Sequence, residues 1–191
     1  KYISYKETNA FSPIVLDYLA GKAQLQEFYA FKPDLEGFKN AINQRKFSGD
    51  RSLLVNVLQQ QYQPIAAPAL VKDHIVALAQ ENTFTITTGH QLNIFTGPLY
   101  FIYKIVTAIN LAKTLKQQFP DDNFVPVYWM ATEDHDFEEI NHVKIEDKML
   151  TWEKQAAGAT GRLNTADMKE VISHYKGYLG LSENGTALSE L

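Results

Sequence analysis

The apolar residues of the first 80 positions recur at helical spacing and are separated by short breaks. Pro13 can open a helix that Gly21 closes, because proline suits a first helical turn and glycine suits the residue after the last one. Asp34 can cap a second helix, which ends before Gly49. This part of the chain is predicted to be helical.

Two further helices are expected over residues 51–61 and 69–80, with Pro64 and Pro68 between them. The first of these is predicted to place four apolar residues on one face, namely Leu53, Leu54, Val57 and Leu58. The second carries Leu70, His74, Ile75 and Leu78 at helical spacing. Residues 1–82 are therefore interpreted as a helical lead-in without chemistry, in which His74 is a packing residue.

The pattern changes to strand, helix and strand after residue 83. Residues 84–88 are aromatic and β-branched, which predicts a strand that ends at Gly89. Residues 124–130 form a near-continuous apolar run of the kind found in buried parallel strands. Pro126 cannot donate to a ladder, so this strand must lie at an edge, or Pro126 must stand near its start.

Gly97 and Pro98 can open the helix that connects the two strands. Its apolar residues form two stripes, which suits a crossover helix covered on more than one side. One stripe holds Leu99, Ile102, Val106 and Ile109, and the other holds Ala108, Leu111 and Leu115. A parallel strand-helix-strand unit would bring the loops after both strands to the same edge of a sheet.

The last 50 residues are expected to hold a strand over 143–150, a loop over 158–165 and a helix over 166–181, with His174 as a packing residue. Residues 83–191 are thus predicted to be the first part of an α/β domain with a parallel sheet, followed by the start of an inserted segment. Because the chain begins at Lys1 and its last helix lacks a partner, we expect a fragment of a longer polypeptide.

The composition excludes several classes of protein. The net charge of −4 and the isoelectric point near 5.7 give no basic footprint, so nucleic acid is not an expected partner unless a local patch overrides the average. No apolar run approaches the roughly 20 residues of a membrane span, and no signal peptide is visible, so we expect a cytoplasmic protein. The absence of cysteine excludes disulfides, thiolate nucleophiles and sulfur-ligated zinc within the chain.

The first loop combines two glycines with polar side chains just before a helix begins. Glycine allows backbone to approach a ligand closely, and a helix N-terminus attracts anions, so the loop could hold a phosphate or a carboxylate. The candidate binding residues are Thr88, Gly89, His90, Gln91, Gly97, Pro98 and Tyr100. The spacing matches neither common phosphate-binding consensus, and a surface turn before a helix is the alternative interpretation.

Lys104 lies one turn beyond Tyr100 on the same helix face. From there its ammonium could reach a phosphate in the first loop. The alternative is a lysine that only solvates the helix.

The second loop places five carboxylates within seven residues, from Glu133 to Glu139. Like charges this close repel, so the loop needs a positive partner such as Mg²⁺ or a substrate ammonium. His135 is the candidate general acid or base, positioned by Asp134 or Asp136. The other candidates are Glu133 for catalysis and Asn141 and His142 for substrate binding.

A solvated helix start capped by Thr132 is the alternative interpretation of this loop. A zinc site is not predicted, because the spacing of His90, His135 and His142 fits no zinc signature. A magnesium-bound nucleotide is the more economical interpretation.

Two strings of this chain resemble the N-terminal part of the BshC family of bacillithiol biosynthesis. They are TTGHQLNIFTGPLYFIYK, over residues 87–104, and PVYWMATEDHDFEEINHV, over residues 126–143. The family's usual first motif is close to TGQQ, and this chain has His90 where glutamine is common. The helical lead-in, including DYL at residues 17–19, is also similar to the family's N-terminal region.

The resemblance implies a Rossmann-like core similar to class I aminoacyl-tRNA synthetases and nucleotidyltransferases, with a coiled coil further on that makes a homodimer. It also implies an ATP-dependent carbon–nitrogen ligase that joins cysteine to glucosaminyl-malate, with Mg²⁺ as a possible companion of ATP. The HIGH motif of the synthetases is absent, and a lysine-rich nucleotide loop would lie beyond Leu191. We therefore expect the fragment to have little activity alone.

Two other classes of function stay open at the level of sequence. One is a metal-dependent phosphohydrolase or nucleotidyltransferase that uses the acidic loop. The other is a binding or assembly module whose nucleotide-like fold has no chemistry.

Overall fold

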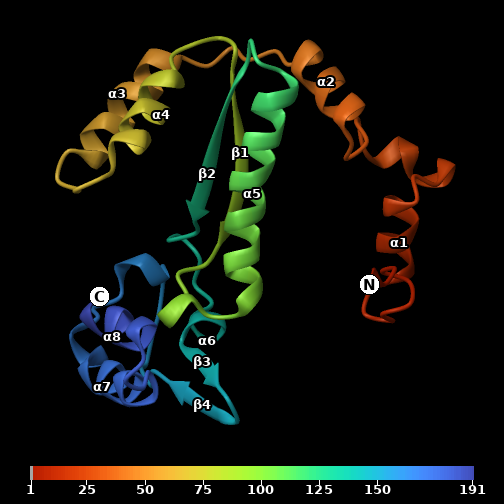
Figure 1. Ribbon diagram of the computed structural model, residues 1–191. Helices are drawn as coiled ribbons and strands as arrows, with labels where there is room; N and C mark the ends of the chain where they lie inside the picture. Colours follow the sequence, from red (N-terminus) through yellow and green to blue (C-terminus); the bar gives the residue numbers. More distant parts are fainter. Residues whose placement is uncertain (1) are drawn as a thin grey trace. The chain divides into compact units, whose positions relative to one another are not determined.

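The computed structural model describes residues 2–191 and divides into two compact units, one ending at Leu53 and one running from Leu54 to Leu191 (Figure 1). The first unit contains α1 (Pro13–Leu19), the 3₁₀ turn η1 (Ala23–Phe28) and α2 (Leu35–Gln44). The Asp34 carboxylate accepts a 2.8 Å hydrogen bond from the Gly37 amide, so it caps α2 as predicted. Gly21, with φ of 63°, follows the end of α1.

The second unit begins within α3 (Arg51–Tyr62), which is followed by α4 (Ala69–Ala77). One core cluster consists of buried residues from these helices and from the sheet: Val55, Ile75, Leu78 and Val125. The predicted face of α3 is wrong, because Leu53 is 60% exposed and Leu54 and Val57 are exposed as well. Packing against the sheet selects Val55 instead, with Leu58 partly buried beside it.

The sheet that positions the candidate site consists of β1 (Thr83–His90) and β2 (Asn123–Met130), which pair in parallel. The long helix α5 (Leu99–Gln118) connects them and runs beside both strands (Figure 1). Ala108, Ala112 and Leu115 are the buried residues of α5. The predicted parallel strand-helix-strand unit is therefore confirmed.

Two details of this unit differ from the prediction. β1 continues through Gly89 to His90, so Gly89 pairs within the strand and does not end it. The first stripe of α5, over Leu99, Ile102, Val106 and Ile109, is exposed in the described residues and is not covered on a second side. Pro126 lies opposite Ile86 in the middle of β2, whose single described neighbour is β1, as expected for an edge strand.

The chain after β2 forms a short helix α6 (Phe137–Ile140) and a hairpin of β3 (His142–Ile145) and β4 (Lys148–Thr151). The single strand expected over residues 143–150 is wrong, because Glu146, with φ of 52°, turns the chain back on itself. The 3₁₀ turns η3 (Thr160–Arg162) and η4 (Ala166–Met168) follow, and then α7 (Lys169–Tyr178) and α8 (Glu183–Glu190).

A second core cluster joins the loop after β1 to the segment that follows β2. Its buried members are Ile94, Phe137, Ile140, Trp152 and Val171. Ile94 belongs to the 3₁₀ turn η2 (Ile94–Thr96). His174 is exposed on α7, so its predicted packing role is wrong. Among residues 2–191, no helix combines the length and the apolar character needed to cross a bilayer.

Candidate active site

The two candidate loops leave the sheet side by side. In the parallel register, Gly89 lies opposite Trp129 and His90 opposite Met130. The Ala131 amide continues the ladder with a 3.1 Å hydrogen bond to the His90 carbonyl, which also accepts one of 3.2 Å from the Tyr128 hydroxyl. The predicted convergence of the glycine-bearing loop and the acidic loop is confirmed.

Gly89 allows this close approach. A Cβ atom at this position would lie 3.0 Å from the Trp129 carbonyl oxygen and 3.1 Å from the Trp129 Cβ. These separations are tighter than ordinary van der Waals contact, so a side chain here would push the two strand ends apart.

His90 is held by hydrogen bonds on both ring nitrogens. Its Nδ1 lies 2.8 Å from Asn93 Nδ2, and its Nε2 lies 2.8 Å from the Tyr100 hydroxyl. Asn93 Nδ2 also donates to the Gln91 carbonyl at 3.3 Å, which fixes the orientation of the amide. Because the amide donates to Nδ1, a neutral His90 carries its proton on Nε2 and donates it to Tyr100.

The turn after Asn93 has an unusual backbone. Three successive residues, Phe95, Thr96 and Gly97, have φ values of 47°, 67° and 56°. This region is disfavoured for residues with a Cβ and costs on the order of 1–3 kcal/mol for each such residue. Gly97 is required here for a second reason, since a Cβ would lie 2.6 Å from the Asn93 side chain. The turn leads through Pro98 into α5.

Lys104 does not point into open solvent. Lys104 lies one turn of α5 beyond Tyr100, and its Nζ donates a hydrogen bond to the Gly89 carbonyl. The ammonium therefore ties α5 to the end of β1, and it brings a positive charge to the edge of the sheet where the loops meet.

The acidic loop is organised by its own carboxylates. Asp136, and not the Thr132 of the alternative interpretation, is the N-cap of α6, and its side chain accepts a 3.3 Å hydrogen bond from the Glu139 amide. Thr132 lies before the helix, since α6 begins only at Phe137, and its carbonyl accepts a 3.0 Å hydrogen bond from the Gly161 amide. A Cβ on Gly161 would lie 2.6 Å from the Thr132 Cβ, so this contact needs glycine.

Asp134 closes the turn that precedes α6. Its carboxylate accepts a 2.9 Å hydrogen bond from the Asp136 amide, and this bond is the main cause that lowers the Asp134 pKa below its ordinary value. Burial opposes this effect and raises the pKa, while the His135 amide and imidazole and the Gln91 side chain lower it further. Asp134 therefore remains an anion at neutral pH. Its carbonyl also accepts from the Thr160 amide at 2.7 Å.

Gln91 links the two loops directly. Its side-chain amide donates a hydrogen bond to the Glu139 carboxylate and contributes to the environment of Asp134. Trp129 approaches the same loop, with its indole nitrogen 3.4 Å from Glu133. The first loop and the end of β2 therefore each supply a hydrogen-bond donor to the acidic loop.

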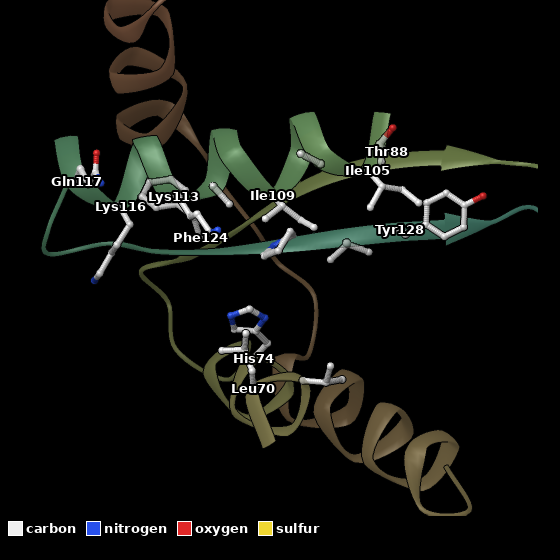
Figure 2. A pocket seen from close by; sticks show the side chains of 15 residues that line it. Leu70, His74, Thr88, Ile105, Ile109, Lys113, Lys116, Gln117, Phe124 and Tyr128 are labelled. Carbon is white, nitrogen blue, oxygen red and sulfur yellow. The ribbon is translucent and has the colours of Figure 1, made fainter. Parts of the chain in front are cut away.

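Some of the predicted site residues take no part in the contact between the glycine-bearing loop and the acidic loop. Thr88 lines a groove of about 710 Å³ between α4, α5 and β2, which Figure 2 shows from close by. His74 of α4 also lines this groove, opposite Phe124 and Tyr128 of β2. Asn141 and His142 follow α6, and their side chains are 3.0 Å apart. In residues 2–191 no three His, Asp or Glu side chains are grouped so that they could hold a metal ion.

The acidic loop also borders a shallow depression of about 730 Å³ that the sequence analysis did not foresee. His135, Asp136, Glu138 and Asn141 line one side of it, and Glu153, Lys154 and Gln155 line the other. Lys154 pairs with Asp167 at 2.7 Å. No sequence signal indicates these three residues, because they reach the loop only through the hairpin of β3 and β4.

Asn93 and Tyr128 are two further residues that the sequence analysis missed. Asn93 stands inside the first motif between Gln91 and Gly97, where a polar residue in a short glycine-bearing loop could have suggested a turn-forming role. The sequence pattern places Tyr128 only within an apolar strand. Burial raises the pKa of its hydroxyl, which keeps the group protonated as a donor to His90.

Comparison with known proteins agrees with this geometry. The family model described as "Bacillithiol biosynthesis BshC, N-terminal Rossmann-like domain" matches residues 1–191. The chain belongs to the BshC family. Its fold is accordingly Rossmann-like, and the parallel pair of β1 and β2 with α5 between them is part of that domain.

Curated relatives bear the name "Putative cysteine ligase BshC". That of Flavobacterium psychrophilum is 48% identical over 99% of this chain, and that of Flavobacterium johnsoniae is 49% identical over 99%. A Bacillus cereus relative is 35% identical over 68% of the chain and 24% of its own length. The chain spans 36% of the length of each Flavobacterium protein, so it corresponds to about a third of them.

Proposed function

We propose that the protein carrying this chain joins cysteine to glucosaminyl-malate through an amide bond in bacillithiol biosynthesis, in a reaction driven by ATP. The family match over residues 1–191 and the name of the relatives support the pathway and the cysteine substrate. The observation that carries the proposal is the parallel register of Gly89 with Trp129, which places both polar loops at one edge of the sheet. Ligands of Rossmann-like sheets bind at this edge.

The chemistry requires two things of the site. A carboxylate is a poor electrophile toward an amine, so the cysteine carboxyl must be activated, and ATP supplies that activation when it is bound. The amine of the glucosamine unit must also lose its proton before it can attack. His135 is the proposed general base for this proton, because a neutral imidazole has a ring nitrogen that can accept one and the Asp134 carboxylate neighbours it.

The acidic loop is proposed to bind the cysteine ammonium and to orient His135. Asp134 is suited to this role, because its lowered pKa keeps it ionised and it neighbours His135. Asp136 is already engaged with the Glu139 amide as the cap of α6, so it would fix the loop's shape. Glu133 lies beside Trp129 at the entrance of the loop.

The first loop is proposed to bind anionic oxygens of ATP or of glucosaminyl-malate. The first turn of α5 leaves backbone amides without intrahelical acceptors, and its dipole favours an anion there. Gly97 and Pro98 place this turn next to His90 and Tyr100. Gln91 and Lys104 supply further donors, although each already has one acceptor within the protein.

The acidic loop fits Mg²⁺ only if ATP supplies part of the metal's coordination. Because the described part of the chain groups no three acidic or imidazole side chains, Mg²⁺ would need oxygens from ATP in addition to those of the acidic loop.

The proposal also includes that the full-length protein is a cytoplasmic homodimer.

The experiment that tests the proposal is a reconstitution with the full-length protein. Cysteine, glucosaminyl-malate, ATP and Mg²⁺ are supplied together, and the amide product is measured by mass spectrometry alongside ATP consumption. The same gene should restore bacillithiol to a deletion strain. Asp134→Asn and His135→Ala should each lower the product yield by about tenfold or more, as expected for a positioned base and its partner.

Other outcomes identify the two alternative functions. Phosphate release that is independent of any amine acceptor would indicate a phosphohydrolase. Unchanged bacillithiol in cells that carry Asp134→Asn and His135→Ala together would indicate a binding module without chemistry. Residues 1–191 alone are expected to have little activity, and clear turnover by them would contradict this part of the proposal.

A further inference from the structure

Tyr175 of α7 stacks on Phe95 of the turn after β1. The two ring centroids are 3.9 Å apart and the ring planes are inclined by only 3°. Phe95 is the residue of this turn with φ of 47° and ψ of 39°, a left-handed conformation that an aromatic residue rarely adopts. The contact therefore falls on a strained position of the candidate site.

The surroundings of Phe95 explain how the turn keeps this conformation. Ile94, the preceding residue, is 7% exposed and belongs to the cluster with Phe137, Trp152 and Val171. The Gly97 amide closes the turn with a 2.9 Å hydrogen bond to the Ile94 carbonyl. A strained backbone persists only when its surroundings hold it, and here a buried side chain and a stacked ring hold two adjacent residues.

The turn is connected to the polar groups of the site through Asn93. Gly97 packs directly against the Asn93 side chain, which donates to Nδ1 of His90. His90 in turn contacts Tyr100 in the first turn of α5. A change in the backbone at Phe95 would therefore move Asn93 away from His90 and alter the start of the helix.

We propose that Tyr175 is a positioning residue, which clamps Phe95 and so holds the turn of residues 94–97, His90 and the first turn of α5 in the arrangement that binds the anionic substrate. This inference rests on the proposed function. It assigns a role at the site to α7, a helix that contributes no ligand-binding side chain of its own.

The test compares four variants of the full-length protein with the wild type. Tyr175→Ala removes the ring, Tyr175→Phe keeps it without the hydroxyl, and Tyr178→Ala removes an exposed tyrosine from the same helix. Phe95→Leu removes the other ring of the stack, and it replaces Tyr175→Ala in the measurements if that variant does not fold. The first measurement is amide hydrogen exchange in the peptide that covers residues 94–97, which needs no activity.

Tyr175→Ala and Phe95→Leu should speed this exchange by about three- to tenfold, as expected from the energy of an aromatic pair. The KM for glucosaminyl-malate should rise by a similar factor in both variants. Tyr175→Phe and Tyr178→Ala should stay within about twofold of the wild type. A general loss of stability would instead speed exchange across the whole chain.

The outcomes separate this inference from the proposed function. Unchanged exchange at residues 94–97 in both ring-deletion variants would overturn the clamp. Faster exchange with unaltered kinetics would overturn its role in positioning the site. A wild-type protein that forms no amide product would refute the proposed function, while the exchange measurement would still decide whether Tyr175 holds the turn.

Discussion

Gln91 and Glu139 stand 48 positions apart in the sequence and form a hydrogen bond across the two loops of the candidate site. Gln91 extends from the loop after β1, and Glu139 lies in α6 after β2. The bond is possible because the parallel register places both strand ends at the same level. It makes the glycine-bearing loop and the acidic loop one polar surface.

Replacement of Gln91 tests this link. Gln91→Ala should lower kcat/KM for amide formation by about three- to tenfold, since a hydrogen bond to a charged group is lost at a partly exposed site. Gln91→Glu should have a larger effect, because it puts a third carboxylate beside Glu139 and Asp134. Steady-state kinetics of the full-length protein measure both. Gln118→Ala, at an exposed position of α5, is the control and should behave as wild type.

Asp134 should make stability depend on pH in the acidic range. Its pKa is lowered in the folded protein, mainly by the hydrogen bond from the Asp136 amide, so its contribution is present above the ordinary value of 3.8 and is lost as the pH falls through the lowered pKa. The difference in Tm between wild type and Asp134→Asn should be constant near neutral pH and shrink below pH 3.8. A difference that stays the same down to the lowest pH would show that ionisation of Asp134 is irrelevant.

Gly97→Ala should destabilise the protein. The new Cβ would lie 2.6 Å from the Asn93 side chain, and alanine does not favour φ of 56°. A loss of about 1–3 kcal/mol in the free energy of unfolding is expected. Gly177→Ala is a matched control in α7, where a Cβ meets nothing within 4 Å, and it should be neutral or stabilise by up to about 1 kcal/mol. Chemical denaturation measures both changes.

Lys104→Met should loosen the start of α5 from β1. The hydrogen bond from Nζ to the Gly89 carbonyl is lost, and a bond to a charged donor contributes about 1.5–3 kcal/mol when it is well shielded. Because Lys104 is partly exposed, the lower end of that range is expected in thermal unfolding. Lys113→Met, on the same helix, should leave the Tm unchanged. An effect of Lys104→Met on the KM for ATP without any effect on Tm would mean that the lysine acts on the ligand alone.

Local pattern was sufficient to predict the elements around the site. The β-branched and aromatic residues before Gly89, the Gly97–Pro98 start of α5 and the apolar run that ends at Met130 each depend on neighbours in the chain. Their order implies a parallel pair, because a strand-helix-strand connection of this length returns the second strand in the same direction. The resemblance of the two motifs to the BshC family is likewise a property of the sequence, and the family match confirms it.

Which side chain does what was decided by contacts between distant residues. The alternative interpretation of the acidic loop caps its helix with Thr132, whereas α6 begins at Phe137 and is capped by Asp136. Periodicity predicted that α3 buries the face of Leu53, Leu54, Val57 and Leu58, whereas packing against β2 buries Val55. The stack of Tyr175 on Phe95 has no local signal at all. The sequence by itself determined the strand-helix-strand elements around the site and their order, because these depend on short-range backbone and side-chain preferences. Only the tertiary structure decided which polar groups meet, because hydrogen bonds and packing depend on positions that the fold brings together.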